Sequence, residues 1–423
     1  MNNLLDAREM RLRYVHELIK STGRPVVVIK SNTPGPHKNT KDAYVLVRLF
    51  LLELKNHIGV ASSVMMDSAD GPYALLSIDA TDLIETKKRL VELEETHELG
   101  RMIDLDLYMD ATYSISRVHL SLASRRCFIC EQDARICSRN QTHDTYELIE
   151  FIHQKVMNYL KNLVMNHAKK AMEQELNLEH KFGLVTPTSF GSHPDMNYQL
   201  MQKAMHAIIP FFGMLFEQAY HAKDLDTLFQ SSRMIGMIAE EKMREATEGI
   251  NCYKGLIFIL GLVIIGLGST LAEGHDFDAL FKKISYMTRD LKQELGHSKN
   301  TFGEQAFQLY GILGARGDAM KGLPSVFQAL NSIDSNKELS QKDLRRLLKD
   351  IFLNTEDSVM LKRAKSLEFY EQVQRKFKEN PLKTEDDAIK LTKFCVEHHL
   401  SLGGSADLLV ATLFLNSIKP YFF

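Results

Sequence analysis

The sequence has few cysteines and no excess of charge of either sign. Its 423 residues contain five cysteines, an odd number, and no apolar signal run follows Met1. We therefore expect free or metal-bound thiols in a reducing cytoplasm rather than a disulfide framework. Because 52 basic residues nearly balance 54 acidic ones, the net charge is only -2, and no overall field attracts nucleic acid or an anionic membrane. Any site for a polyanion must be local.

Internal repeats and low-complexity tracts are also lacking. Hydrophobic residues at 44% and charged residues at 25% are typical of globular proteins, which excludes a disordered or fibrous chain. The length suffices for two or three domains, each with its own core.

One run without charge, residues 255–271, is almost long enough to cross a bilayer. It contains four glycines and lacks the aromatic belt and basic flanks that anchor a membrane-spanning helix. Close packing between helices explains the glycines, so we predict a buried core helix and no membrane contact.

The spacing of the hydrophobic residues changes along the chain. In the first 160 residues helical and strand patterns alternate, which predicts an α+β fold. The expected helices are 4–20, 42–58 and 83–95, and the expected strands are 26–29 and 74–80. From about residue 145 onward the long segments are helical in period. We therefore predict a multidomain protein, with an α+β domain over 1–160 and an all-α domain over 161–423, joined by a continuous helix.

Asp104 and Asp106 alternate with apolar residues. On a strand the two carboxylates share one face, about 7 Å apart. Such a pair can hold Mg²⁺ on a triphosphate, because this hard cation prefers carboxylate and phosphate oxygens. The preceding Gly100-Arg101 could meet phosphate. The alternative is an ordinary solvated strand edge.

Three cysteines and a histidine follow shortly afterwards: Cys127, Cys130, Cys137 and His143. Four nitrogen and sulfur donors are enough for a closed tetrahedral zinc site. The alternative is that the cysteines are small buried hydrophobic residues. The arginines around them would serve a phosphate or an acidic partner, or form a solvated basic turn. They are Arg125, Arg126, Arg135 and Arg139.

Five motifs of the first 160 residues combine these groups with further arginines and glycines. They are Arg8-Glu9 with Arg11 and Arg13, Asn32-Thr33-Pro34-Gly35-Pro36-x-Lys38, Gly100-Arg101-x-x-Asp104-x-Asp106, Arg125-Arg126-Cys127-x-x-Cys130, and Cys137-x-Arg139-x-x-x-His143. Together they resemble the holo-citrate-lyase synthase family, which transfers phosphoribosyl-dephospho-coenzyme A from its triphosphate to a serine and releases pyrophosphate. The resemblance implies the acyl carrier (gamma) subunit of citrate lyase as partner. It also implies that Asp104 and Asp106 position Mg²⁺ and the triphosphate, while Lys38 and Arg101 compensate charge.

Five polar segments interrupt the apolar helices of the remaining chain. They are Lys181-Phe182-Gly183-Leu184-Val185 through Gly191-Ser192-His193-Pro194-Asp195-Met196, Gly249-Ile250-Asn251-Cys252-Tyr253-Lys254-Gly255, Thr301-x-Gly303-Glu304 through Gly317-Asp318, Thr355-Glu356-Asp357, and Leu402-Gly403-Gly404-Ser405-Ala406-Asp407. Glycine at a helix start lets backbone N–H groups approach a phosphate. The alternative is that these glycines serve only as helix caps or at close helix crossings.

Together the segments resemble triphosphoribosyl-dephospho-coenzyme A synthase over about residues 165–420. That family joins ATP to 3′-dephospho-coenzyme A, expels adenine and keeps the triphosphate. Because the ribose C1′ becomes cation-like as adenine leaves, the resemblance implies a carboxylate there, Asp195 or Glu304. The residues implied for binding ATP or its Mg²⁺-triphosphate are Lys181, Lys254, Arg316, Asp357, Ser405 and Asp407. The sequence departs from the family pattern at Phe182, Thr186, Cys252-Tyr253, Ser358 and Leu402.

The two resemblances predict a bifunctional enzyme that makes and attaches the prosthetic group of citrate lyase. The helical half would make the triphosphate that the α+β half consumes. ATP and 3′-dephospho-coenzyme A are the expected substrates, Mg²⁺ is the expected cofactor, and Zn²⁺ remains open. Two alternatives are the equivalent enzymes of malonate decarboxylase and a Cys/His-cluster binding protein without catalysis. The near-neutral charge disfavours a nucleic-acid partner.

Overall fold

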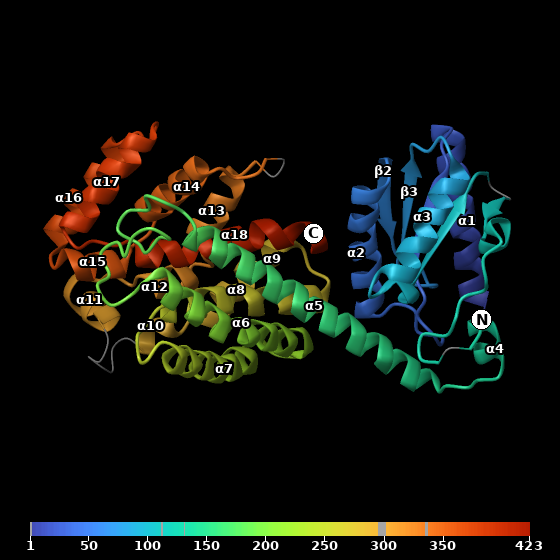
Figure 1. Ribbon diagram of the computed structural model, residues 1–423. Coiled ribbons are helices and arrows are strands. Elements are labelled where there is room, and N and C mark those ends of the chain that lie inside the picture. The colour runs from blue at the N-terminus through green and yellow to red at the C-terminus, as the bar shows by residue number, and fades with distance from the viewer. Residues whose placement is uncertain (1, 111–112, 131, 295–301, 335–336) are drawn as a thin grey trace. The chain divides into compact units, whose positions relative to one another are not determined.

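The computed structural model describes residues 2–110, 113–130, 132–294, 302–334 and 337–423. Contacts divide the chain into two compact units, residues 1–160 with 420–422 and residues 161–419 with 423. The N-terminal unit is built around a sheet, and the second unit consists of helices (Figure 1). This arrangement confirms the predicted fold class.

The sheet of the N-terminal unit is antiparallel, with the strand order β2-β3-β1-β4-β5. Its strands are β1 (Val26–Ser31), β2 (Val60–Met66), β3 (Tyr73–Ile78), β4 (Ile103–Tyr108) and β5 (Ser114–Ile115). The helices of this unit are α1 (Asn2–Thr22), α2 (Lys41–His57), α3 (Leu83–Thr96) and α4 (Ala134–Arg139), with 3-10 turns η1 (Gly100–Met102) and η2 (Arg117–Leu120). In the register of the central strand β1, Lys30 lies opposite Tyr73 of β3 and Asp104 of β4.

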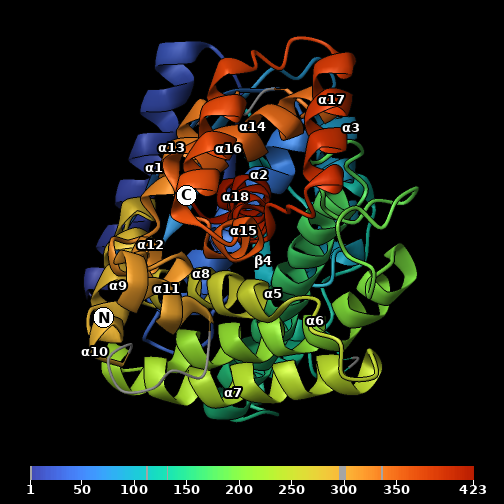
Figure 2. The ribbon, with the colours of Figure 1, turned by 90° about the vertical axis from the view of Figure 1, so that its left-hand side faces the viewer.

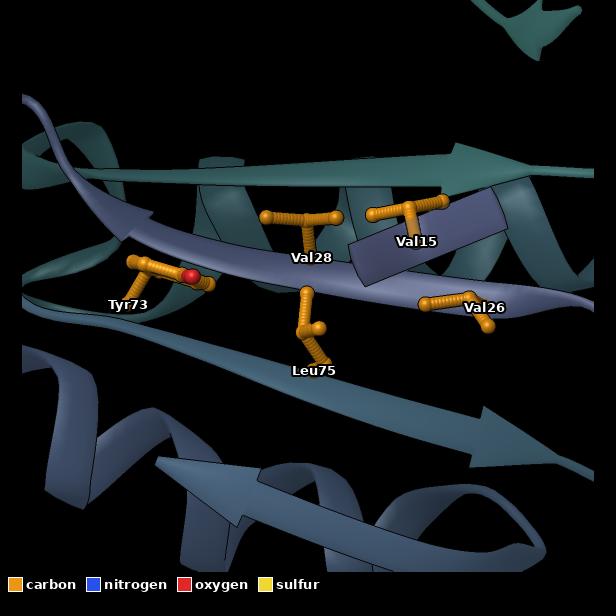
Figure 3. Close-up of a cluster of buried hydrophobic side chains, with 5 residues drawn as sticks. All are labelled: Val15, Val26, Val28, Tyr73 and Leu75. Carbon is orange, nitrogen blue, oxygen red and sulfur yellow. The ribbon is translucent and has the colours of Figure 1, made fainter. Parts of the chain in front are cut away.

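One face of the sheet carries an apolar cluster beneath α1 (Figure 3). Val26 and Val28 of β1 meet Tyr73 and Leu75 of β3, and Val15 of α1 covers them. The alternate residues of β1 point to the opposite face and are equally buried, with α2 packed against β1 and β3. Burial on both faces explains why β1 is a continuous apolar run rather than an alternating one.

The helical unit runs from the middle of α5 to α18. Its helices are α5 (Thr145–Leu176), α6 (Tyr198–His221), α7 (Leu225–Ala246), α8 (Lys254–Glu273), α9 (Phe277–Thr288), α10 (Leu291–Glu294), α11 (Phe302–Tyr310), α12 (Ala315–Met320), α13 (Pro324–Ser332), α14 (Gln341–Asn354), α15 (Ser358–Ala364), α16 (Leu367–Glu379), α17 (Glu385–Glu397) and α18 (Gly403–Phe422). Figure 2 views α18 nearly end-on, and most of the side chains of its first three turns are buried. This helix is therefore a central element of the unit.

The long helix α5 belongs to both units. Its first half carries His153, whose Nδ1 lies 3.0 Å from an Asp42 carboxylate oxygen in the N-terminal unit. Its second half carries His167, whose Nδ1 lies 2.9 Å from the Ser417 hydroxyl in the helical unit. The predicted continuous helix between the α+β and the helical regions is therefore present.

The apolar run 255–271 forms most of α8. By length and composition this helix could cross a membrane, but 83% of its most apolar window is buried inside the protein. It packs against α6, α7 and α9. A Cβ on Gly268 would lie 2.8 Å from the Ala219 Cβ of α6, so glycine permits this close crossing. The prediction of a buried core helix is confirmed.

In the N-terminal unit, the strands β2 and β5 and the helix α4 were not predicted from the sequence. β2 is an edge strand in which no residue is buried, so it lacks the apolar alternation that marks a half-buried strand. β5 has two residues and α4 has six, both too short to show a period.

Candidate active site

Asp104 and Asp106 lie on the same face of β4, as the alternating pattern predicts. Asp104 lies opposite Lys30 of β1, and Asp106 lies opposite Val28. Desolvation by the surrounding protein atoms and then the charge of Asp104 raise the pKa of Asp106. Repulsion between the two carboxylates thus contributes to the raised pKa, and a bound cation would relieve that repulsion.

Arg125 joins Asp104 to a buried glutamate. Its guanidinium donates to a carboxylate oxygen of Asp104, to Glu94 and, at 3.2 Å, to the carbonyl of Ile103. Glu94 is only 2% exposed and also accepts from the Leu105 N–H at 2.8 Å. Burial raises the pKa of Glu94, although the charge of Arg125 acts against this. Arg125 is therefore held from three sides and fixes the Asp104 carboxylate.

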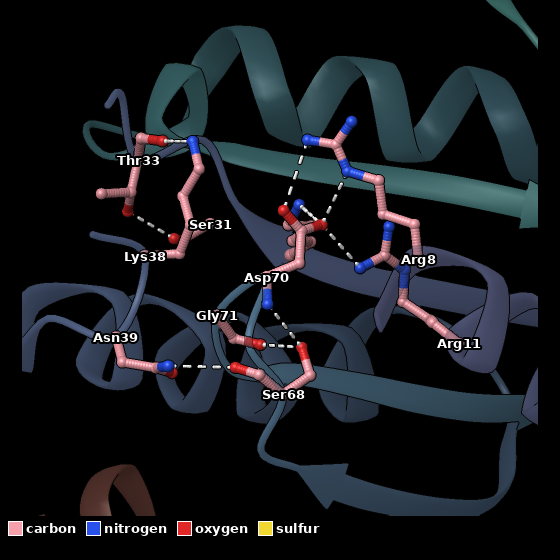
Figure 4. Close-up of polar contacts among 10 residues, drawn as sticks. Arg8, Arg11, Ser31, Thr33, Lys38, Asn39, Ser68, Asp70 and Gly71 are labelled. Atoms are coloured by element: carbon pink, nitrogen blue, oxygen red, sulfur yellow. Dashed lines mark hydrogen bonds and ion pairs between the residues drawn. The ribbon is translucent and has the colours of Figure 1, made fainter. Parts of the chain in front are cut away.

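Three cations surround another carboxylate, Asp70, in the turn before β3 (Figure 4). The fully buried Asp70 accepts from Arg8 Nε at 3.2 Å, from Arg11 Nη1 at 3.0 Å and from Lys30 Nζ. Burial acts to raise the pKa of Asp70, but these cations lower it to about 2. Because Lys30 also lies opposite Asp104, this cluster borders the carboxylate pair of β4. Asp70 was not predicted from the sequence, because a single acid in a turn has no spacing signal.

A cavity of about 1200 Å³ opens in the N-terminal unit. It is lined by the loop after β1, the end of α3, η1, η2, and residues within 122–128 and 134–148. Among the described residues, its walls carry the cationic side chains of Lys38, Arg101, Arg117, Arg125 and Arg126, and the carboxylates of Glu94, Glu95 and Asp144. Arg117 and Arg125 pair with these glutamates. The structure thus brings the predicted phosphate-binding residues Lys38 and Arg101 to one cavity. Asp104 and Asp106 are not among the described residues that line it, and Arg125 connects the cavity to Asp104.

The loop after β1 is fixed where it borders this cavity. Lys38 Nζ donates to the Thr33 carbonyl, and burial and then the charge of Lys30 lower its pKa. Gly35 has φ +74, and a Cβ there would lie 2.8 Å from Thr145 Cγ2. Glycine is thus required both by the left-handed backbone and by the close approach to the start of α5.

The predicted zinc ligands converge in space. One donor atom from each of Cys127, Cys130, Cys137 and His143 lies within 4.8 Å of the other three. The Sγ atom of Cys137 is 3.6 Å from that of Cys127 and 3.9 Å from that of Cys130. Cys127, Cys137 and His143 also line the cavity. The donor set fits Zn²⁺.

In the helical unit, Lys181 is fully enclosed. Its side chain is 1% exposed, and Nζ donates to a carboxylate oxygen of Glu175 at 2.8 Å and to its carbonyl at 2.6 Å. Burial lowers the pKa of Lys181, while the charge of Glu175 acts against this. The arrangement favours a role for Lys181 in holding Glu175 over direct contact with a phosphate.

Asp357 joins the starts of two helices. Its carboxylate accepts from the N–H groups of Val359 and Met360 at the start of α15, at 3.0 and 2.9 Å. It also accepts from the N–H and the hydroxyl of Ser405, at 2.8 and 2.7 Å. A carboxylate offers about four acceptor positions, so these contacts occupy them. Burial raises the pKa of Asp357 in spite of these bonds. The geometry favours Asp357 and Ser405 as positioning residues.

Asp407 differs, because its carboxylate has no hydrogen-bond partner among the described residues. It faces the start of α8, where a Cβ on Gly255 would lie 2.1 Å from its Oδ2 atom. Burial, followed by the charges of Asp357 and Glu175, raises the pKa of Asp407 far above its ordinary value. An unpaired acid with a strongly perturbed pKa is a candidate for acid–base chemistry.

The Tyr253 hydroxyl is buried near the same acids and lacks a partner within the described ranges of the chain. Burial, followed by the charge of Glu175, raises the pKa of Tyr253 well above its ordinary value. Buried polar groups are normally satisfied, so an unsatisfied one beside a site is available to a ligand. In the sequence, Tyr253 stands out only as a departure from the family pattern.

Asp195 is exposed on the loop before α6. Burial and then the Asp195 charge raise the pKa of Cys252 to about 11, which places Asp195 near the start of α8. Arg363 supports its loop by donating to the Ser192 carbonyl and to His193 Nδ1, both at 2.9 Å. Arg363 was not predicted from the sequence, because no neighbouring glycine or acid marks it as a site residue.

The remaining predicted residues lie on other helices. Lys254 is exposed at the start of α8 and pairs with Glu240 at 3.0 Å. Arg316 lies on α12, just after Gly314, which packs against Ser358 of the Asp357 segment. Glu304 lies on α11, and its side chain falls outside the described residues. The segment 252–255 is thus where Asp195, Asp407 and Tyr253 approach one another.

Comparison with known families matches each unit to an enzyme. Residues 1–159 match the family described as apo-citrate lyase phosphoribosyl-dephospho-CoA transferase. Residues 161–422 match the family described as ATP:dephospho-CoA triphosphoribosyl transferase. A cation-lined cavity in one unit and gathered acids at helix starts in the other agree with these matches. The chain is a transferase with two catalytic units.

Relatives with both units in one chain are also known. The chain is 31% identical to Protein CitXG of Leuconostoc mesenteroides subsp. cremoris over 97% of its own length and 96% of that protein's. Identity to Protein CitXG of Haemophilus influenzae is 30%, over 98% and 96% of the two chains. A probable 2-(5''-triphosphoribosyl)-3'-dephosphocoenzyme-A synthase of Lactiplantibacillus plantarum is 33% identical over 60% of this chain and 96% of its own. The chain belongs to the CitXG family of fused citrate lyase prosthetic-group enzymes. The malonate decarboxylase and non-catalytic alternatives are not supported.

Proposed function

We propose that the chain carries out two consecutive reactions in the cytoplasm. In the helical unit, the 2′-hydroxyl of 3′-dephospho-coenzyme A displaces adenine from the ribose C1′ of ATP. The product is 2′-(5″-triphosphoribosyl)-3′-dephospho-coenzyme A. In the N-terminal unit, a serine hydroxyl of the citrate lyase acyl carrier (gamma) subunit attacks the α-phosphorus of this product and releases pyrophosphate. The tandem match of both units to these two enzyme families carries the proposal.

The charges of the N-terminal cavity support the transfer reaction. Lys38, Arg101 and Arg126 face one space, where they compensate the charge of the triphosphate and of the leaving pyrophosphate. Arg125 donates from the cavity wall to Asp104 and so fixes this carboxylate beside the cavity. Asp104 and Asp106 would hold Mg²⁺, which when bound neutralises phosphate charge.

The acids around the start of α8 support the synthase reaction. Adenine leaves from a carbon that gains positive charge, and the attacking hydroxyl must lose a proton. Adenine takes up a proton as it leaves, while the proton of the attacking hydroxyl passes to solvent. Asp407 fits the role of proton donor to adenine, because it is unpaired and its raised pKa favours the protonated carboxyl group. Asp195 fits stabilisation of C1′, because it is exposed near the same segment. Glu304 remains the other predicted acid, and Lys254 and Arg316 remain the predicted contacts of the triphosphate.

Mass measurement of the carrier tests the transfer reaction. When the full chain is supplied with the purified triphosphate intermediate and apo-carrier, Asp104→Asn should reduce carrier labelling about 100-fold, since the proposed Mg²⁺ site loses one of its two carboxylates. Adenine release from ATP and 3′-dephospho-coenzyme A by the same variant should stay unchanged. The matched control is Asp79→Asn, an exposed aspartate of the same unit. Undiminished labelling by Asp104→Asn would refute the role of this carboxylate.

A further inference from the structure

We propose that Cys127, Cys130, Cys137 and His143 bind one Zn²⁺ ion, and that this ion fixes the arginine-bearing wall of the transferase cavity. The metal site itself depends only on these four side chains. The role in the cavity rests on the proposed function of the N-terminal unit.

The distances between the sulfur atoms suit a tetrahedral metal. A Zn–S bond of about 2.3 Å places two sulfurs of a tetrahedron about 3.8 Å apart. The Cys137 Sγ lies 3.6 Å from the Cys127 Sγ and 3.9 Å from the Cys130 Sγ. With His143, all four donor atoms fall within 4.8 Å of one another. The three sulfurs and the imidazole are therefore close enough together to share one metal ion.

His143 is oriented as a metal-binding histidine is. Its Nδ1 lies 3.3 Å from a carboxylate oxygen of Glu147, one turn along at the start of α5. Its Nε2 is buried and has no hydrogen-bond partner among the described residues. A carboxylate on one ring nitrogen and a metal on the other is the usual arrangement of a zinc-bound histidine.

The cluster holds the arginines through the backbone. The Ala134 N–H donates to the Arg125 carbonyl at 2.8 Å, and the turn between them carries Cys127 and Cys130. Arg101 donates from the other side of the cavity to the Cys127 carbonyl at 3.2 Å. A metal that fixes these two cysteines to α4 therefore fixes the backbone that carries Arg125 and Arg126, and the carbonyl that holds the Arg101 guanidinium.

The helix α4 has little apolar packing of its own. The α4 helix has six residues, and of these only Cys137 is buried, while Ile136 is 54% exposed. Thiol–thiol contacts are weak hydrogen bonds, so they contribute little order without a metal. Four protein ligands close the coordination shell of zinc and leave no position for a reactive water. The ion therefore acts by positioning and not as a catalyst.

Metal analysis of the full chain tests the site without any substrate. Protein purified from zinc-supplemented cells should contain one zinc per chain. Cys130→Ser and His143→Ala should each lower this below one fifth, whereas Cys395→Ala, a buried cysteine of the other unit, should retain it. After exchange for Co²⁺, the absorption bands of a tetrahedral thiolate site should appear. A folded protein purified from these cells without zinc would overturn the proposal.

Kinetics on the same samples test the role in the cavity. Removal of zinc should raise the KM for the triphosphate intermediate in carrier labelling about tenfold and leave adenine release unchanged, and re-addition of zinc should restore the KM. Unchanged adenine release also shows that the helical unit of each variant is folded. Full carrier labelling by metal-free protein would overturn the positioning role. If no sample labels the carrier while zinc is bound, the proposed transfer reaction fails and the metal site stands.

Discussion

Asp70 and Asp79 carry the same charge and both meet an arginine, but their surroundings differ. The Asp70 side chain is fully buried against Arg11 and Lys30, whereas that of Asp79 is 60% exposed beside Arg24. Water replaces the partner of an exposed ion pair at little cost, but it cannot reach Asp70. Asp70 should therefore contribute more than Asp79 to the free energy of unfolding.

Replacement of Asp70 by Asn should lower the free energy of unfolding of the N-terminal unit by about 2 kcal/mol at pH 7. The pKa of Asp70 is lowered from 3.8 to about 2, so its stabilisation is present above pH 4. It should be lost as the pH falls from about 4 to about 2. Urea unfolding at several pH values checks this. Asp79→Asn should change stability by less than about 0.5 kcal/mol, and equal losses in the two variants would contradict the argument.

Unlike Asp70, Asp407 should be needed for activity and not for stability. Burial raises the pKa of Asp407, so the charged carboxylate is disfavoured in the folded protein. Asp407 therefore lowers the free energy of unfolding by an amount that grows as the pH rises above about 4. Asp407→Asn should therefore leave the thermal midpoint at pH 8 unchanged or higher. Adenine release should fall at least 100-fold, since a proton-transfer group is lost. Chromatography of adenine and thermal unfolding of one sample measure both effects, and normal adenine release would exclude the role.

The sequence predicted some of these residues because their signal is local. Asp104 and Asp106 are two positions apart on a strand, and this spacing alone puts them on one face. The four zinc-type donors also lie close together in the chain. Glu94 and Glu175 could not be predicted, because each is defined by a partner that only folding brings near, Arg125 and Lys181 respectively.

At the scale of elements, the spacing of apolar residues predicted helices, but it did not predict where they cross. Four glycines in α8 indicated close packing, but the sequence could not say which of them meets a neighbouring helix. In the structure a Cβ on Gly268 would meet Ala219 and the backbone of α6. On α7, a Cβ on Gly236 would only touch Ile257 at 3.8 Å. Alanine substitution at Gly268 and at Gly236 therefore compares a crowded helix position with an open one.

We predict that Gly268→Ala destabilises the helical unit by about 1–3 kcal/mol, because the added methyl forces α6 and α8 apart. Gly236→Ala should be neutral or stabilise by up to about 1 kcal/mol, since alanine favours the helix and has room there. Thermal and urea unfolding of the two variants provide the comparison. If both variants lose stability equally, the close crossing is not what requires glycine.

At the scale of the whole molecule, two enzymes share one chain and one intermediate. Tethering raises the local concentration of an intermediate only if it is captured before it diffuses away. An equimolar mixture of Asp104→Asn and Asp407→Asn chains tests this, because each variant keeps the activity that the other lacks.

We expect the mixture to load the carrier after a lag, at no more than half the rate of the unmodified chain. Each chain type supplies one step, so the intermediate must leave one molecule and enter another. Mass spectra of the carrier over time give the rate. A mixture that loads no carrier, although each remaining activity is intact, would show that the intermediate is not released.

The helix α5 has a consequence for how the two activities can be separated. Its 32 residues cross the division between the units without a break, and Lys155 and Lys161 lie on either side of it. Proteases cut exposed segments that can adopt an extended conformation, and the backbone of a hydrogen-bonded helix is not extended. Brief trypsin treatment should therefore leave the synthase and the transferase covalently linked. A genetic split at this position would expose the unpaired carbonyls and amides of a severed helix, so the natural fusion cannot be undone by trimming a spacer.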